Sequence, residues 1–140
     1  MTDAPQTPPQ LPPVVGGIVP YLTPSNATEA ADFYGQAFGA ESLYRMPVDA
    51  QGRTMHIHLK INGNSLMLSD AYPDHGHPFQ TPAGSSLHLQ VDDVDAWFER
   101  AVAAGCEVTL PVQLMFWGDR YGQLRDPFGF PWSIATTPKA

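Results

Sequence analysis

Apolar positions along the first half of the chain follow the spacings of strands and of a helix in turn. From Met55 to Ile61 every second residue is apolar, with His56, His58 and Lys60 between them, which predicts a half-buried strand. Between Asn26 and Gly39 the apolar residues recur at helical spacing, and Asn26 with Glu29 three positions later predicts a capped helix start. We therefore predict a strand at about 18–23, a helix ending at Gly39, and strands at about 41–47, 54–61 and 65–69.

The second half repeats this order. A strand is predicted at 85–91, and Asp92 or Asp93 caps a helix that ends at Gly105. Further strands follow at about 107–114, 117–124 and 130–135. Gly63, in the turn after the third predicted strand, follows Gly39 by 24 residues, and Gly129 follows Gly105 by the same 24. The chain is therefore predicted to carry an internal βαβββ repeat.

The predicted fold class is α+β, with two βαβββ repeats whose curved sheets surround a cleft and whose helices lie on the outer side. A single repeat leaves a sheet face uncovered, and a second repeat can cover it. The domain is placed at 18–137, with repeat one at about 18–70 and repeat two at about 85–137. Residues 1–17 are rich in proline and poor in apolar side chains, so they are predicted to form a flexible tail that could pack on a partner subunit.

Composition limits the classes of partner. The 140 residues carry a formal net charge of −7, which argues against nucleic acid and against an anionic membrane surface. No apolar run is long enough to span a bilayer, and no leader pattern is recognised, so a cytoplasmic location is expected. The single cysteine, Cys106, fits a reducing compartment, and we interpret it as a small buried residue.

Polar side chains gather on one face of several predicted strands. His56 and His58 share a face, as do Ser86, His88 and Gln90, and these faces are predicted to line the concave side. For any single histidine a solvated sheet face is the simpler interpretation, but the pattern across three strands favours a small-molecule site.

The stretch from Phe116 to Gly129 is the most distinctive in the sequence. It places Arg120 between Trp117 and Tyr121 and ends in a turn signature, Asp-Pro-Phe-Gly. A guanidinium among aromatic rings needs an anionic or carbonyl partner, so Trp117, Arg120 and Tyr121 are added to the predicted ligand wall. His75 and His77, in the proline-containing loop at 70–84, are interpreted as surface residues.

Several of these motifs together resemble the vicinal oxygen chelate superfamily (glyoxalase, bleomycin-resistance and dioxygenase proteins), and most closely its PhnB-like branch. The resemblance runs from about Val19 to Thr136 and is carried by these segments: Pro20-Tyr21-Leu22, Ala31-Asp32-Phe33-Tyr34, Phe38-Gly39-Ala40-Glu41, Leu66-Met67-Leu68-Ser69-Asp70, Ser86-Leu87-His88-Leu89, Phe98-Glu99-Arg100-Ala101 and Phe116 to Trp132. It implies the glyoxalase/bleomycin-resistance fold. It does not by itself fix an activity, because this fold serves several.

Enzymes of that superfamily usually hold one divalent metal by His and Glu side chains of the first and fourth strand of each repeat. Carried over, those positions fall near Val19 and at Met67, Ser86 and Ser133, and none of them is a histidine or a carboxylate. We therefore expect neither a metal nor another cofactor.

Two functions remain. The first is a homodimeric binding protein that takes a small molecule in its cleft without the usual metal, for which the net charge suggests a cationic compound. The second is a lyase or isomerase of the same superfamily, either metal-free, with His88 or His58 acting beside Arg120 and Tyr121, or with relocated His ligands. The residues named for binding are His56, His58, Ser86, His88, Gln90, Trp117, Arg120 and Tyr121.

Overall fold

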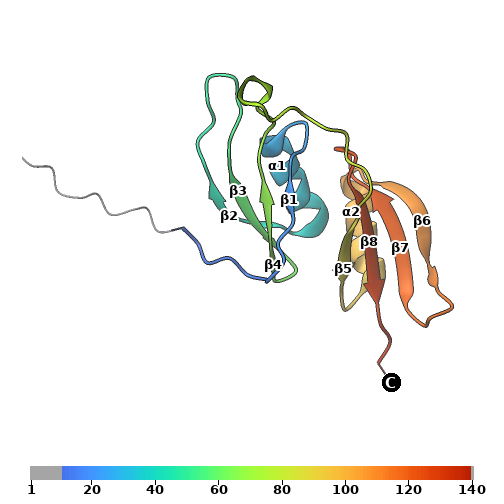
Figure 1. Ribbon diagram of the computed structural model, residues 1–140. Helices are drawn as coiled ribbons and strands as arrows, with labels where there is room; N and C mark the ends of the chain where they lie inside the picture. The colour runs from blue at the N-terminus through green and yellow to red at the C-terminus, as the bar shows by residue number, and fades with distance from the viewer. Residues whose placement is uncertain (1–10, 140) are drawn as a thin grey trace, which may run out of the picture.

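The computed structural model describes residues 11–139 as two βαβββ repeats of the same topology (Figure 1). The first repeat comprises β1 (Tyr21–Leu22), α1 (Ala27–Phe38), β2 (Glu41–Arg45), β3 (Ile57–Ile61) and β4 (Asn64–Leu68). The second comprises β5 (Leu87–Gln90), α2 (Val94–Ala104), β6 (Glu107–Leu114), β7 (Arg120–Arg125) and β8 (Pro131–Thr136). A short 3-10 helix, η1 (Pro73–His75), lies in the connection between them.

Each repeat forms one four-stranded mixed sheet, and the strand orders correspond. The order is β1-β4-β3-β2 in the first sheet and β5-β8-β7-β6 in the second. In each sheet the first strand pairs in parallel with the last, while the other pairs are antiparallel. The predicted α+β class and the predicted repeat are both confirmed.

Both helices begin where the sequence places them. The Asn26 side chain accepts a hydrogen bond from Glu29 N at 3.0 Å, and Asp93, rather than Asp92, accepts one from Ala96 N at 3.2 Å. A side chain from in or just after the last strand of the same repeat also accepts a hydrogen bond from the first turn of each helix. Asp70 accepts from Ala27 N, and Thr136 Oγ1 accepts from Val94 N, both at 2.8 Å.

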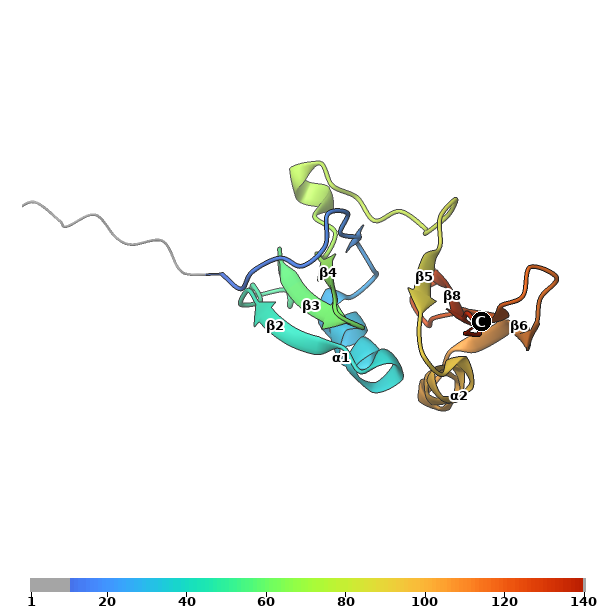
Figure 2. The ribbon, with the colours of Figure 1, turned by 90° about the horizontal axis from the view of Figure 1, so that it is seen from below.

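The helices pack side by side beneath the two sheets, as Figure 2 shows. Arg100 of α2 ties them together by donating from Nε to Gln36 O at 2.8 Å. The apolar strand faces pack against the helices as expected: Ile57, Leu59 and Ile61 of β3 are buried in the core. Neither described helix, at 12 and 11 residues, is long and apolar enough to cross a bilayer.

The two repeats share one core. Tyr34 and Phe38 of α1 pack on Trp132 of β8, with ring centroids 5.4 and 4.3 Å apart. The buried Asp126, in the turn before β8, accepts hydrogen bonds from Tyr34 Oη at 2.5 Å and from Trp132 Nε1 at 2.9 Å. The repeats therefore pack on each other within one chain.

The hairpin between β6 and β7 differs from its prediction. The strand was expected to begin at Trp117, but Phe116 and Trp117 lie in the turn and β7 begins at Arg120. Gly118, at φ +105°, allows the chain to reverse there, and its N–H donates to Met115 O at 3.0 Å. Gly122 is needed for packing instead, because a Cβ at that position would lie 2.7 Å from the Phe98 ring and would clash with it.

Candidate functional site

The second sheet carries a polar cluster on the face turned away from the helices. Leu89, Trp132 and Ile134 point into the core, so their strand neighbours His88 and Ser133 project from the opposite face. The register sets these two side by side, because His88 in β5 is paired with Ser133 in β8.

A chain of hydrogen bonds runs through this cluster. Ser133 Oγ lies 2.6 Å from His88 Nδ1, and His88 Nε2 lies 2.9 Å from Gln90 Oε1. Gln90 Nε2 donates to Thr137 Oγ1 at 2.6 Å, which directs its carbonyl oxygen toward the histidine. This orientation of the Gln90 amide suits an imidazole proton on Nε2, with Nδ1 as the acceptor for the Ser133 hydroxyl.

Aromatic rings extend the cluster along β7. Tyr121 stacks on His88 with centroids 6.1 Å apart and planes inclined by 20°, and Trp117 meets Tyr121 edge to face at 5.4 Å. Gln123 Nε2 donates to Tyr121 Oη at 2.9 Å. The cluster thus combines aromatic surface with uncharged hydrogen-bonding groups.

A groove of about 410 Å³ lies beside this cluster, between the two repeats. Ser86, His88 and Gln90 line one side, and Asn62 and Asn64 of the β3–β4 turn line the other. Asn62 Nδ2 donates to Gln90 O at 2.9 Å, which joins the sides at one end. None of the described residues lining it is an Asp, Glu, Lys or Arg.

Arg120 lies apart from this cluster. It forms a two-pronged ion pair with Asp95 in the first turn of α2, with Nε and Nη2 at 2.9 and 2.7 Å from the carboxylate oxygens. The guanidinium hydrogen bond lowers the pKa of Asp95. The structure therefore brings His88, Gln90, Trp117 and Tyr121 together and places Arg120 against the helix instead.

The first sheet also holds a histidine–serine pair, but that pair is covered. His58, only 2% exposed, has its Nε2 2.7 Å from Ser65 Oγ. Val15 N donates to the same Oγ at 2.8 Å, and Ser65 N donates to Val15 O at 2.9 Å. Of the predicted tail at 1–17, residues 1–10 lie outside the described residues, while the part around Val15 runs across β4.

His56 lies outside the groove as well, just before β3. Its Nδ1 is 2.9 Å from Tyr21 Oη, and its ring contacts those of Tyr21 and Tyr44. Burial, and then the neighbouring His58, lower the pKa of His56. His56 therefore belongs to an aromatic group on the first sheet.

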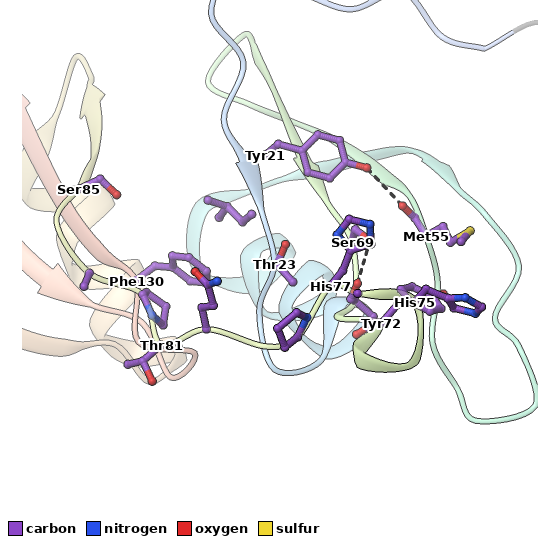
Figure 3. Close-up of a pocket in the computed structure, with 17 residues that line it drawn as sticks. Tyr21, Thr23, Met55, Ser69, Tyr72, His75, His77, Thr81, Ser85 and Phe130 are labelled. Atoms are coloured by element: carbon purple, nitrogen blue, oxygen red, sulfur yellow. Dashed lines mark hydrogen bonds between the residues drawn. The ribbon is translucent and has the colours of Figure 1, made fainter.

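A second cavity, of about 740 Å³, lies where the sequence predicted only a polar loop. Figure 3 shows Tyr21, Thr23, His77 and Phe130 around it. The loop folds back because Tyr72 and His77 exchange backbone hydrogen bonds of 2.7 and 2.9 Å. Since the loop has no apolar periodicity, the two histidines and three prolines at 70–84 were the only signal there.

The residues at the expected metal positions do not fit a divalent ion. Met67 offers a thioether, Ser133 is hydrogen-bonded to His88, and Ser86 is a neutral hydroxyl on an exposed edge. Within residues 11–139, no three His, Cys, Asp or Glu side chains come together in a way that could hold a metal.

Comparison with known proteins identifies the fold family. Residues 16–134 match the model of the Glyoxalase/Bleomycin resistance protein/Dioxygenase superfamily. The uncharacterized protein Rv0887c of Mycobacterium tuberculosis H37Rv is 42% identical over 121 residues, which are 82% of this chain and 71% of that protein. The crystal structure of PA1353 from Pseudomonas aeruginosa is similar at a TM-score of 0.69 and 32% identity, covering 87% of this chain and 98% of that one.

A PhnB protein structure from Bacillus cereus, described as a putative 3-demethylubiquinone-9 3-methyltransferase, matches with a TM-score of 0.68 over 87% of this chain and 100% of that chain. Its 23% identity supports the shared fold alone. The repeated βαβββ topology and the family match agree with each other. The chain belongs to the Glyoxalase/Bleomycin resistance protein/Dioxygenase superfamily.

Proposed function

We propose that this protein binds a small, uncharged, planar molecule on the open face of its second sheet, without a divalent metal. The observation that carries the proposal is the cluster of Trp117, Tyr121, His88 and Gln90, where aromatic rings lie next to fixed, uncharged donors and acceptors. Pockets for small ligands commonly combine apolar and aromatic walls with a few oriented polar groups.

The composition of the groove argues for a neutral ligand over the cation that the net charge suggested. The charge of −7 acts at long range, whereas binding depends on the groups that replace water at the site. The groove offers amide, hydroxyl and imidazole groups and no carboxylate among its described lining residues. A buried cation would therefore lose hydration without gaining a counter-charge.

The lyase or isomerase alternative finds less support in the same geometry. His58 is enclosed beneath Val15, and Arg120 is engaged by Asp95 on the helix side. Neither can act together with Tyr121 in the way that alternative needs.

The proposal is tested by a thermal-shift panel with chelator-treated protein. The panel contains neutral planar heteroaromatic amides, planar cations, planar carboxylates and divalent metals. We expect shifts with the neutral compounds, and we expect Tyr121→Leu to abolish them. Phe79→Leu is the matched control, because Phe79 is an exposed aromatic outside the cluster of His88, Gln90, Trp117 and Tyr121. Binding that requires stoichiometric metal, or that is unchanged in Tyr121→Leu, would contradict the proposal.

We also propose that the protein forms a homodimer through the β6–β7 hairpin. Phe116 is 95% exposed and Leu114 69% exposed at its tip, which is unusual for apolar side chains that have no partner. Light scattering after size exclusion should give a dimer for the native chain and a monomer for Phe116→Ser. A monomeric native chain at micromolar concentration would refute this.

A cytoplasmic location and membership of the PhnB-like branch are part of the same proposal. The free Cys106 thiol supports the first, and the sequence motifs between Val19 and Thr136 that resemble that branch support the second. Fractionation of the native host and phylogenetic placement would test them.

A further inference from the structure

We propose that Ser133 and His88 form a nucleophile–base pair that accepts the acyl group of small aryl esters. The hydroxyl and the imidazole are already at hydrogen-bond distance, 2.6 Å, and a third residue orients the base. Nucleophilic catalysis by serine depends on this arrangement of hydroxyl, adjacent base and orienting group. Ser133 lies in β8 and not in a nucleophile-elbow turn, so no local sequence motif marks the pair.

The direction of each hydrogen bond suits the chemistry. Thr137 fixes the amide of Gln90, and Gln90 Oε1 accepts the proton on His88 Nε2. Nδ1 is then left with its lone pair toward Ser133 Oγ, so the hydroxyl donates to a base rather than accepting from it. Gln90 is a positioning residue, since it acts through His88.

The proposed step keeps all atoms and charges in balance. Ser133 Oγ attacks the ester carbonyl carbon as its proton passes to His88 Nδ1. The bond from that carbon to the aryl oxygen then breaks, and the aryl oxide leaves with the proton from His88, or is released as the anion. Once His88 has passed its proton to the aryl oxide or to solvent, water attacks the acyl carbon and gives a proton to His88 Nδ1. The bond from that carbon to Ser133 Oγ then breaks, the carboxylic acid leaves, and the proton returns from His88 to Ser133 Oγ.

The surroundings favour a short acyl chain on an aromatic leaving group. Ser133 is 5% exposed, so little room exists around Oγ for a long chain. Tyr121 and Trp117 supply aromatic surface next to His88, against which an aryl group can pack. Because the orienting group is a neutral amide and not a carboxylate, the imidazolium is stabilised less than in a Ser-His-Asp triad. Acylation should therefore be detectable but slow.

The first repeat contains its own control. His58 and Ser65 make the same kind of contact at 2.7 Å, but Ser65 is 1% exposed and also accepts from Val15 N. A reagent that merely reacts with any serine near a histidine would label both. The proposal predicts labelling at Ser133 and none at Ser65.

The test uses the full chain with 4-nitrophenyl acetate. We expect a burst of one nitrophenolate per chain, the mass gain of one acetyl group, and peptide mapping to Ser133. Ser133→Ala should lose the burst, and His88→Phe should slow acylation about 10²-fold, the lower range for loss of a general base. Circular dichroism checks that both variants fold.

A second variant separates chemistry from structure. Gln90→Glu places a carboxylate against His88, which favours the imidazolium and should raise the acylation rate and move its pH midpoint upward. A purely structural role for the network predicts no gain. Acetyl found on Lys60 or another amine instead of Ser133, or an unchanged burst in Ser133→Ala, would overturn the proposal. Loss of the proposed chemistry would leave the thermal shift with neutral ligands intact, so the two failures can be told apart.

Discussion

Replacing Asp126 should be among the most destabilising single changes in this protein. Its Oδ2 accepts from Tyr34 Oη and Trp132 Nε1, and its Oδ1 accepts from Phe128 N and Phe130 N at 2.9 and 3.0 Å. Asp126 is 3% exposed and Tyr34 is fully buried, so water cannot replace the lost acceptor. The carboxylate joins α1 of the first repeat to β8 of the second.

The magnitude follows from the donors left without a partner. Asp126→Ala leaves two buried donors, Tyr34 Oη and Trp132 Nε1, without an acceptor, which costs about 1–3 kcal/mol of stability for each. Together with the weakened turn we expect a loss of about 3–5 kcal/mol, a large part of the total stability of a small domain. Asp126→Asn keeps one acceptor but turns an amide N–H toward one of the donors, so we expect about 1–3 kcal/mol.

Equilibrium urea unfolding measures both losses, with an unchanged m-value showing that the folded state remains compact. Asp92→Asn, at an exposed position, serves as the control and should stay within about 0.5 kcal/mol of the native chain. Trp132→Phe should cost less in the Asp126→Asn background than in the native one, because the stranded indole N–H is then gone. A loss below about 0.5 kcal/mol for Asp126→Asn, or strict additivity in this cycle, would refute the reasoning.

Three further changes test other parts of the structure. Arg120→Leu should leave ligand binding unchanged. Because Arg120 lowers the pKa of Asp95, the ion pair contributes to stability at pH values above the ordinary Asp pKa. The difference in stability between the native chain and the variant should therefore disappear as the pH falls below the lowered pKa of Asp95. Trp117→Ala should weaken ligand binding. Because Trp117 is 49% exposed, the loss of unfolding free energy, measured by urea unfolding, should be far smaller than the roughly 3–5 kcal/mol expected for a buried tryptophan. Burial raises the pKa of the Cys106 thiol to about 12, so a disulfide-exchange reagent at pH 8 should react with it only after denaturant is added; fast native-state reaction would contradict that burial.

The local parts of the fold could be predicted from the sequence because each depends on residues close together in the chain. The Asn26 cap involves Glu29 three positions away, and the alternation at 55–61 is a property of one strand. The repeat could be predicted from glycine spacing. Asp126 was identified as a turn residue, which it is, but its partner Tyr34 lies 92 positions earlier and no local pattern joins them.

Arg120 shows a different kind of error, one that the sequence itself could have prevented. Neighbouring residues in a strand project from opposite faces, so Arg120 and Tyr121 could not both face the ligand once β7 was predicted to be extended. Closeness in sequence is therefore no evidence that two strand residues share a face. The partner of the Arg120 guanidinium is Asp95, in a helix whose first turn the sequence had correctly placed.

The two repeats have the same topology but offer different surfaces, and that difference decides where function can lie. Each sheet places a histidine beside a serine on the face away from the helices. In the first sheet the segment around Val15 runs over that pair and satisfies the serine, so His58 serves the structure. In the second sheet His88 stays exposed, its ring stacks on Tyr121, and its polar partners Ser133 and Gln90 are uncharged. The two pairs do not correspond in the repeat, because His58–Ser65 joins β3 to β4 whereas His88–Ser133 joins β5 to β8. The chain that precedes β1 closes the first of them. The exposed histidine of the two pairs therefore lies on the second sheet, and the proposed ligand and ester sites share the face of β5, β7 and β8.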